Sequence, residues 1–177
     1  TCGQCFRGYL AKDSNINIGD SYMNIVIPMV GEGRRFKEAG YKDPKPFIMV
    51  AGKPMIVWVI ESLLSSISFN KEKDRFIFIT RHASPWLDML DWICEKMSLP
   101  RKIINIDKIT DGAVCSMLLA KNLINSYEEL LIVCSDQVTY FNKEHFNWLR
   151  TFPYCVAVPF VFRLKGKDSK WSFCKTN

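Results

Sequence analysis

The sequence predicts one α/β domain, a Rossmann-like three-layer α/β/α arrangement around a mainly parallel, mixed sheet. The chain has 177 residues, which is enough for one domain with a hydrophobic core and too few for two of ordinary size. Its 48% of apolar and 24% of charged residues are typical of a globular protein. From residue 23 onward, short apolar runs alternate with stretches of helical periodicity. This alternation is typical of a sheet covered by helices on both faces.

Five segments are short, apolar and rich in β-branched or aromatic residues, which predicts strands. They lie at 24–29, 75–80, 102–106, 129–137 and 154–162. Glycines follow the first of them, and the fourth ends in a polar tip, SDQ. Residues 1–22 have weak periodicity and are predicted to be a leader or linker, so the predicted domain spans 23–177.

Four segments carry apolar residues at helical spacing. They lie at 54–67, 84–97, 111–124 and 143–150. Pro54 stands in the first turn of the first helix, and the second has Ser84 as its N-cap and Pro85 at its first helical position. For the third helix either Asp111 or Thr110 is the expected cap. The loop between the first strand and the first helix is long and glycine-rich, which favours a functional loop.

Composition and cysteine usage exclude several classes of protein. No apolar run approaches the roughly 18 to 20 residues that cross a bilayer, and the first residues lack the apolar core of a signal peptide. We therefore expect a cytoplasmic protein without membrane insertion. The seven cysteines are odd in number and mostly lie in apolar stretches, which favours reduced thiols. Cys2 and Cys5 form a C-x-x-C, half a zinc site or a redox pair, but no second pair follows at zinc spacing.

The formal net charge of +6 is compatible with nucleic acid, anionic lipid or a small polyanionic substrate. The basic residues are spread along the chain, without the dense basic helix or the aromatic ladder of a nucleic-acid platform. The sequence therefore favours a small polyanion and predicts no nucleic-acid partner.

Ligands of an open α/β sheet bind outside the carboxyl ends of the strands, so the segments after the strands are the candidate site. In GEGRRF, after the first strand, Gly31 and Gly33 let backbone N–H groups approach phosphate oxygens, and Arg35 adds a fork of donors. The segment is no dinucleotide-binding fingerprint, because the third glycine is missing and no helix is expected directly after it, and it is no P-loop. In DPKPF, prolines on both sides of Lys45 fix where its ammonium points.

Taken together, the apolar strand, G-x-G-x-R-F, P-K-P-F and G-K-P-M-I resemble the signature of the sugar-nucleotide pyrophosphorylases, nucleotidyltransferases of the NTP transferase family with a GT-A-like fold. DGAVCSMLLAKNLI resembles that family's G-A-x-x-(S/T)-x-L-x-A segment. DSKWSFCK is similar to the P-K-W-S-Y-x-K strand of the branch found with capsule and other surface-glycan genes. The resemblance covers residues 23–175 and stops inside the family's domain, so we expect a domain that is incomplete at its C-terminal side.

The resemblance implies a role for each matching residue. Catalysis would rest on Arg35 at the triphosphate, Lys45 at the reacting phosphate and Asp136 as the ligand of Mg²⁺. The substrate side would include Gln137 and Lys175. The implied nucleotide-binding residues are Met29, Gly31, Glu32, Gly33, Arg35, Gly112 and Ala113.

The implied reaction transfers a nucleoside monophosphate from an NTP to a sugar 1-phosphate or a similar phosphorylated acceptor, with release of pyrophosphate. Two alternatives stay open. One is a non-catalytic nucleotide-sugar-binding or regulatory domain of the same fold. The other is a GT-A glycosyltransferase, although such enzymes usually hold their metal with D-x-D where this chain has SDQ. The base, the sugar and the oligomeric state, a homo-oligomer included, are not fixed by the sequence.

Overall fold

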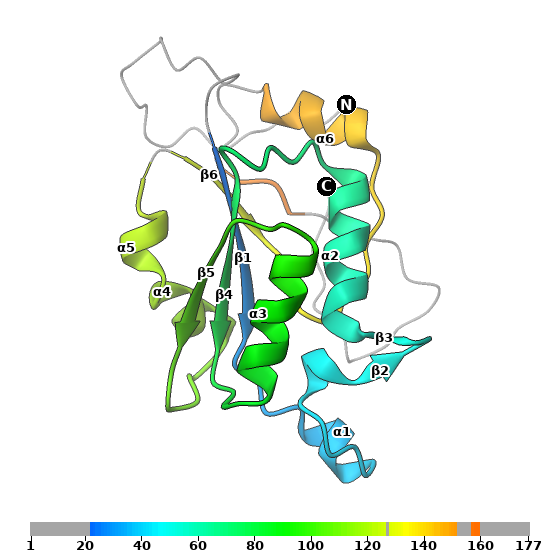
Figure 1. Ribbon diagram of the computed structural model, residues 1–177. Coiled ribbons are helices and arrows are strands. Elements are labelled where there is room, and N and C mark those ends of the chain that lie inside the picture. The colour runs from blue at the N-terminus through cyan, green and yellow to red at the C-terminus, as the bar shows by residue number, and fades with distance from the viewer. Residues whose placement is uncertain (1–21, 127, 152–156, 160–177) are drawn as a thin grey trace, which may run out of the picture.

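A computed structural model describes residues 22–126, 128–151 and 157–159 of the chain (Figure 1). Its main element is a sheet of four strands in the order β5-β4-β1-β6, and every neighbouring pair is parallel. The strands are β1 (Met23–Met29), β4 (Arg75–Thr80), β5 (Arg101–Asn105) and β6 (Glu129–Ile132). The parallel α/β fold is therefore confirmed. The predicted leader, apart from Tyr22, and Lys175 lie outside the described residues.

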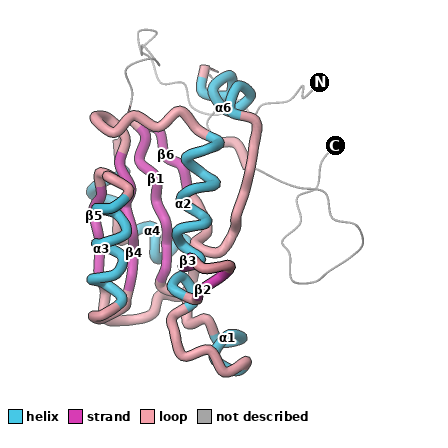
Figure 2. Tube along the Cα trace, turned by 45° about the vertical axis from the view of Figure 1, so that its right-hand side comes forward, coloured by secondary structure: helices cyan, strands magenta, loops and turns pink. Residues whose placement is uncertain are grey.

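Helices cover both faces of this sheet, which gives the three predicted layers (Figures 1 and 2). They are α2 (Met55–Ser66) and α3 (Trp86–Lys96) on one face, and α4 (Ala113–Leu118) and α5 (Lys121–Ile124) on the other. Side chains alternate along β1, so Ile25 and Ile27 pack with Ile60 of α2, whereas Val26 joins a second cluster with Ala120. Both faces of the central strands β1 and β4 are buried, so these two strands are mostly apolar rather than alternating, whereas β5 and β6 at the edges are partly exposed.

The loop after β1 is more structured than the sequence predicts. A short helix, α1 (Arg34–Glu38), begins directly after Gly33, so the expectation that no helix follows the glycines is wrong. Gly33 has a φ of 62° and serves as the N-cap, a conformation open to glycine, and its carbonyl accepts the N–H groups of Phe36 and Lys37. The rest of the loop contains the 3₁₀ helix η2 (Lys45–Phe47) and a hairpin of β2 (Met49–Val50) and β3 (Lys53–Pro54).

Two predicted helix starts differ from the structure. Ser84 is not the N-cap of α3, because Pro85 holds that position and the first turn closes when Trp86 and Leu87 donate to the carbonyl of Ala83. Neither Asp111 nor Thr110 caps the helix α4, whose N-cap is Gly112 and has no side-chain hydrogen bond.

Two predicted elements are shorter in the structure. The segment 111–124 forms two helices, because the N–H of Leu119 bonds to Ser116 and that of Ala120 to Met117, a tighter i to i−3 pattern that ends α4. The strand β6 ends at Ile132 instead of 137. One further ladder bond joins the N–H of Val133 to the carbonyl of Val26, and then the chain leaves the sheet.

At the far end of the domain, the predicted helix at 143–150 is present as α6 (Lys143–Arg150). Asn142 caps it by accepting the backbone N–H of His145 at 2.7 Å. Of the predicted strand at 154–162, only 157–159 are described, and they have no regular structure.

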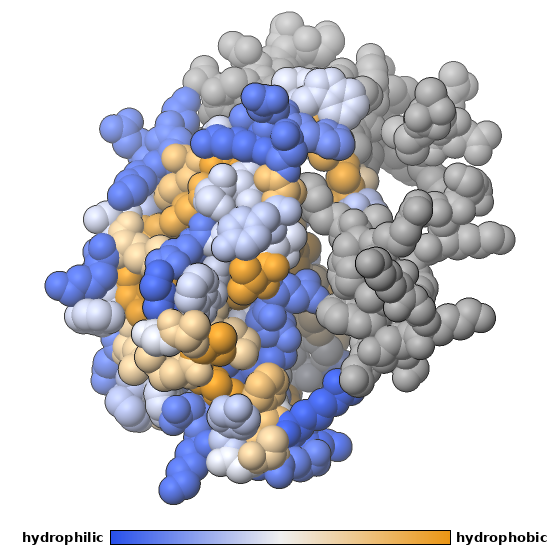
Figure 3. All heavy atoms as spheres, turned by 90° about the vertical axis from the view of Figure 1, so that its right-hand side faces the viewer, coloured by the Kyte–Doolittle hydropathy of each residue, from blue (hydrophilic) through white to orange (hydrophobic). Residues whose placement is uncertain are grey.

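The described surface gives no sign of a membrane span. Among the described residues, no helix is long and apolar enough to cross a bilayer. Figure 3 shows hydrophilic and apolar side chains interspersed over the described part of one face.

Candidate active site

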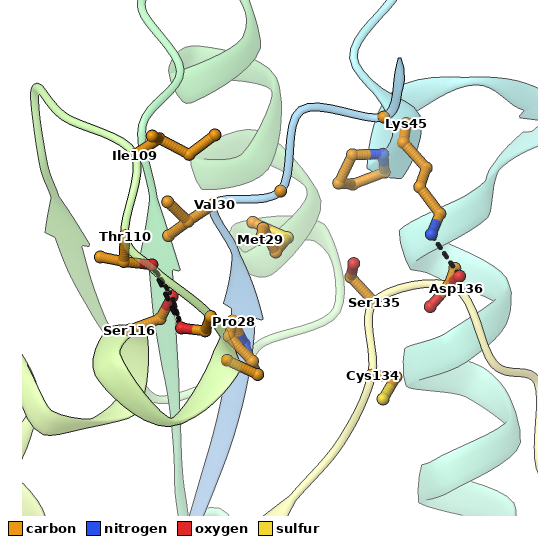
Figure 4. A pocket seen from close by; sticks show the side chains of 15 residues that line it. Pro28, Met29, Val30, Lys45, Ile109, Thr110, Ser116, Cys134, Ser135 and Asp136 are labelled. Atoms are coloured by element: carbon orange, nitrogen blue, oxygen red, sulfur yellow. Dashed lines mark hydrogen bonds and ion pairs between the residues drawn. The ribbon is translucent and has the colours of Figure 1, made fainter. Parts of the chain in front are cut away.

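A pocket of about 290 Å³ lies at the carboxyl edge of the sheet, where β1 and β6 end side by side (Figure 4). Parallel sheets place their ligands at this edge. Three stretches of the chain and the start of η2 meet here. The lining residues are Pro28, Met29, Val30, Gly31, Gly33, Lys45, Pro46, Ile109, Thr110, Gly112, Ala113, Ser116, Cys134, Ser135 and Asp136.

The first wall is the glycine loop with Lys45 against it. A Cβ on Gly33 would lie 3.3 Å from the Cβ of Lys45, closer than ordinary packing allows. Glycine at this position therefore serves two purposes: it adopts the left-handed conformation and it makes room for the lysine.

Lys45 is held at the start of η2 between Pro44 and Pro46. Phe47, two residues after Lys45, is buried and stacks on Trp86 of α3 with ring centroids 5.4 Å apart. This anchor ties the loop to the core, while the ammonium of Lys45 stays partly exposed over the ring of Phe36 at 5.7 Å. The backbone is thus fixed, and the charged end of the side chain reaches into the pocket.

The second wall is the segment that follows β6 and carries Asp136. Its carboxylate forms an ion pair with Lys45 on the side of the pocket away from Thr110 and Ser116, with 34% of the Asp136 side chain and 28% of the Lys45 side chain exposed (Figure 4). Two buried serines of α2 hold the continuation of this segment: the N–H of Thr139 donates to Ser62 Oγ at 3.4 Å, and that of Phe141 donates to Ser66 Oγ at 3.2 Å. Asp136 is therefore positioned from α2 as well as from the sheet.

The third wall runs from Ile109 to Ser116 and includes the start of α4. Thr110 and Ser116 bring their hydroxyl oxygens to 2.6 Å, and both also lie 3.2 Å from the carbonyl of Gly112 (Figure 4). Gly112 has a φ of 152° and no atom within 4 Å of an added Cβ, so the pocket is open beside it. The residues of this wall that line the pocket carry no charge, in contrast to the Lys45 and Asp136 side, and Asp111 lies outside the lining.

One cysteine, Cys134, also lines the pocket. Burial and the nearby Asp136 carboxylate raise the pKa of its thiol, although Lys45 acts in the opposite direction. Cys134 therefore stays a neutral thiol at neutral pH, and it is a weak nucleophile.

Arg81 and His82, which directly follow β4, contact the glycine loop and η2. Arg81 donates its Nε–H to the carbonyl of Val30 at 2.7 Å, and the ring of His82 meets that of Phe47 edge to face at 5.8 Å. Burial and the charge of Arg81 lower the pKa of His82, while a hydrogen bond with the Met29 backbone opposes them. His82 is consequently neutral at pH 7, and its Nε2 is buried without a hydrogen-bond partner among the described residues.

The structure brings together most of the residues singled out by the sequence. Seven of them line the pocket: Met29, Gly31, Gly33, Lys45, Gly112, Ala113 and Asp136. Glu32, Arg35 and Gln137 are exposed outside it, and Glu32 lies 3.5 Å from Arg34 in an ion pair. The functional roles of all these residues stay predictions.

Sequence reasoning gave no site role to Thr110, Ser116, Cys134 or Ser135, all of which line the pocket. Their positions within four residues of Gly112 or Asp136 were the available signal. The described residues contain no group of three or more His, Cys, Asp or Glu side chains that could hold a metal ion.

No family model matches the sequence, and the search of curated proteins found no match. Solved structures, in contrast, share its fold. The nucleoside-diphosphate-sugar pyrophosphorylase from Vibrio cholerae RC9 matches with a TM-score of 0.54 and 20% identity, over 70% of this chain and 52% of that chain. The inositol-1-phosphate CTP transferase from T. maritima matches with a TM-score of 0.51 and 17% identity, over 64% of this chain and 43% of that chain.

The chain thus spans about half of the length of these two proteins, 52% and 43%. The identities are low, so the likeness concerns the fold. It confirms the predicted resemblance at that level: the parallel sheet of this chain, with its pocket at the carboxyl edge, has the GT-A-like fold of nucleotide-sugar pyrophosphorylases and related nucleotidyltransferases.

Proposed function

We propose that the protein is a nucleotidyltransferase that moves a nucleoside monophosphate from an NTP to a sugar 1-phosphate or a similar phosphorylated acceptor and releases pyrophosphate. The observation that carries the proposal is the ion pair of Lys45 and Asp136 in a pocket bordered by Gly33 and Gly112. A cation and a carboxylate beside open backbone suit a triphosphate with its metal. Two proteins of this fold are named for reactions of this class, a pyrophosphorylase and a CTP transferase.

The chemistry would be an in-line displacement at the α-phosphorus. An oxygen of the acceptor phosphate attacks, the bond to the β-phosphate oxygen breaks, and pyrophosphate leaves. The attacking phosphate is already ionised at neutral pH, so no general base is needed. The work of the protein is then to position the reactants and to neutralise charge, and Lys45 would do so at the α-phosphate.

Asp136 is the described residue best suited to hold Mg²⁺. Mg²⁺ is commonly bound by one or two carboxylates, with phosphate oxygens and waters completing its shell, so a single partly exposed carboxylate fits. The ion, when bound, would offset negative charge on the phosphate oxygens.

The uncharged wall suits the nucleoside. Ile109 gives an apolar surface, the open space beside Gly112 leaves room for a base, and Thr110 and Ser116 offer hydroxyl groups to a base edge. In this arrangement the triphosphate points towards Lys45 and the base lies near the start of α4. The role of Arg35 at the leaving pyrophosphate requires α1 to approach the triphosphate, because Arg35 is exposed outside the pocket.

A pyrophosphate-release screen of the purified protein, with nucleoside triphosphates, sugar 1-phosphates and Mg²⁺, tests this function. We expect release that requires one NTP and one acceptor together. Release of pyrophosphate would exclude the non-catalytic alternative, whereas nucleotide binding without any release would support it.

A labelling experiment tests where the nucleotide binds. The thiol of Cys134 lines the pocket, whereas Cys115, also exposed, does not. Bound nucleotide should therefore slow alkylation of Cys134 and leave that of Cys115 unchanged, as measured by mass spectrometry of the two peptides. Equal protection of both cysteines, or of neither, would argue against binding at this pocket.

A further inference from the structure

The ion pair between Lys45 and Asp136 determines the charge of the whole pocket. Of the fifteen described residues that line it, only these two carry a charge at neutral pH. The two charges face each other directly. The pocket as a whole is then neutral, although it combines a cation for phosphate with an anion for metal.

This pairing has opposite consequences for a bare nucleotide and for a metal-bound one. A metal-free triphosphate that approaches Lys45 also meets the Asp136 carboxylate, which repels it and competes for the ammonium. A metal ion that approaches Asp136 alone meets the ammonium in the same way. A triphosphate that carries its metal gives each residue a new partner of opposite charge in one step.

The surrounding contacts keep the pair closed at rest. Lys45 lies against the ring of Phe36 at 5.7 Å and next to Gly33, and the segment after Asp136 is bound to Ser62 and Ser66 of α2. Both side chains are nevertheless partly exposed, so rotation of the side chains can exchange partners without movement of the sheet.

We infer that the Lys45–Asp136 ion pair is a latch that makes nucleotide binding depend on a divalent cation. The Lys45–Asp136 ion pair stays intact when a metal-free nucleotide approaches. It breaks when a metal-bound nucleotide supplies each of the two residues with a new partner of opposite charge. The inference rests on the proposed function, since it concerns the same triphosphate site.

Binding measurements on four proteins test the latch without relying on turnover. Calorimetry gives the Kd of the preferred NTP, with Mg²⁺ and with EDTA, for the wild type, Asp136→Asn, Lys45→Gln and the double variant. In EDTA, Asp136→Asn should bind nucleotide about threefold to fivefold more tightly than the wild type, the upper part of the range for a partly exposed charge interaction. The same variant should lose most of the tightening that Mg²⁺ gives the wild type.

The double variant separates a latch from simple charge repulsion. If Asp136 acts by holding Lys45, then Asp136→Asn should improve metal-free binding by less than about twofold when Lys45 is already Gln, because each site's effect depends on the other. An equal improvement in both backgrounds would overturn the latch. Asp111→Asn is the matched control, since it removes the same charge from an exposed position next to the pocket wall and should leave metal-free binding unchanged.

The outcomes also separate the two proposals. If the wild type binds the metal-bound nucleotide but Asp136→Asn gains nothing in EDTA, the latch is wrong and the proposed function stands. If the wild type binds no nucleotide in either condition, both are wrong. Asp136→Ala, with circular dichroism to check folding, should repeat the direction seen with Asp136→Asn.

Discussion

Lys45 and Asp136 meet in one ion pair, yet the chain positions them by different means. Lys45 is fixed by its neighbours in sequence, with prolines on both sides and Gly33 within the same loop. Asp136 is fixed by distant residues, because its segment leaves β6 and is held by Ser62 and Ser66 of α2. A short motif can therefore specify one half of a site while the other half depends on tertiary contacts.

Removal of the lysine itself should have the largest effect. Lys45→Ala should lower kcat/KM for pyrophosphate release by about 10²- to 10³-fold, the usual loss when a group that stabilises the transition state is removed. The free energy of unfolding should change by less than about 1 kcal/mol, because the ion pair is partly exposed. Steady-state kinetics and thermal unfolding give the two quantities.

Lys53→Ala is the matched control for that change. Lys53 lies outside the pocket, 2.8 Å from both carboxylate oxygens of Glu61 and 4.8 Å above the ring of Trp58. Its replacement should leave kcat/KM within about twofold, since it touches no lining residue of the site. An equal loss in the two variants would refute a specific role for Lys45.

A change in the glycine next to the lysine should have the second largest effect. Gly33→Ala forces a Cβ into a φ of 62° and to 3.3 Å from the Cβ of Lys45. We expect a loss of about 1 to 2 kcal/mol in the free energy of unfolding, measured with denaturant, and a lower kcat/KM because Lys45 must shift.

Gly31→Ala gives the contrast within the same loop. No atom lies within 4 Å of a Cβ at Gly31, and its φ is outside the left-handed range. Its free energy of unfolding should change by less than about 0.5 kcal/mol. If both glycine variants were equally unstable, the account of Gly33 would be incorrect.

The wall that carries Asp136 should lose part of its support when Ser66 of α2 is replaced. Ser66→Ala removes the acceptor of the Phe141 N–H, so hydrogen exchange at that amide should speed up about fivefold, the effect of a hydrogen bond of about 1 kcal/mol. Ser65→Ala is the control, because Ser65 Oγ donates to the carbonyl of Ser62 in the same helix. Unchanged exchange in Ser66→Ala would show that α2 does not hold this wall.

The smallest expected effect is on the pH dependence of unfolding, through His82 next to Phe47. Burial lowers the pKa of His82, so the folded state binds its proton less readily than the unfolded state, whose pKa is near 6.5. The stability contributed by neutral His82 is therefore complete above that value and declines as pH falls below it. Replacement by Gln should flatten the pH dependence of unfolding between about pH 7 and 5. An unchanged slope would exclude His82 as its source.

The sequence predicted the elements whose signals are local. The strand at 75–80 matches β4 (Arg75–Thr80), and the strand at 24–29 and the helix at 54–67 differ from β1 and α2 by one or two residues, because apolar periodicity defines them. The segment 111–124 was predicted as one helix, since its periodicity continues across the turn at Leu119 and Ala120. Periodicity does not report the switch to i to i−3 bonds that ends α4.

The residues of the site show the same contrast between local sequence signals and tertiary contacts. Gly33 and Lys45 were found because glycine and proline patterns indicate their conformation, and Gly112 was found through the resemblance of its segment to that of the family. Asp136 was found at a predicted strand tip, although the strand ends at Ile132. The ion pair, and the support of one wall by Ser62 and Ser66, depend on residues far apart in the chain, which no local pattern brings together.

The most direct test of the central claim is to follow the phosphates of the nucleotide. The protein is incubated with Mg²⁺, a sugar 1-phosphate and NTP labelled in parallel at the α- or the γ-phosphate. A nucleotidyltransferase should place the α-label in a nucleotide-sugar product and the γ-label in pyrophosphate, and Lys45→Ala should slow both transfers by about 10²- to 10³-fold. Appearance of the γ-label as inorganic phosphate, or an α-label that never joins the sugar, would contradict the proposed reaction.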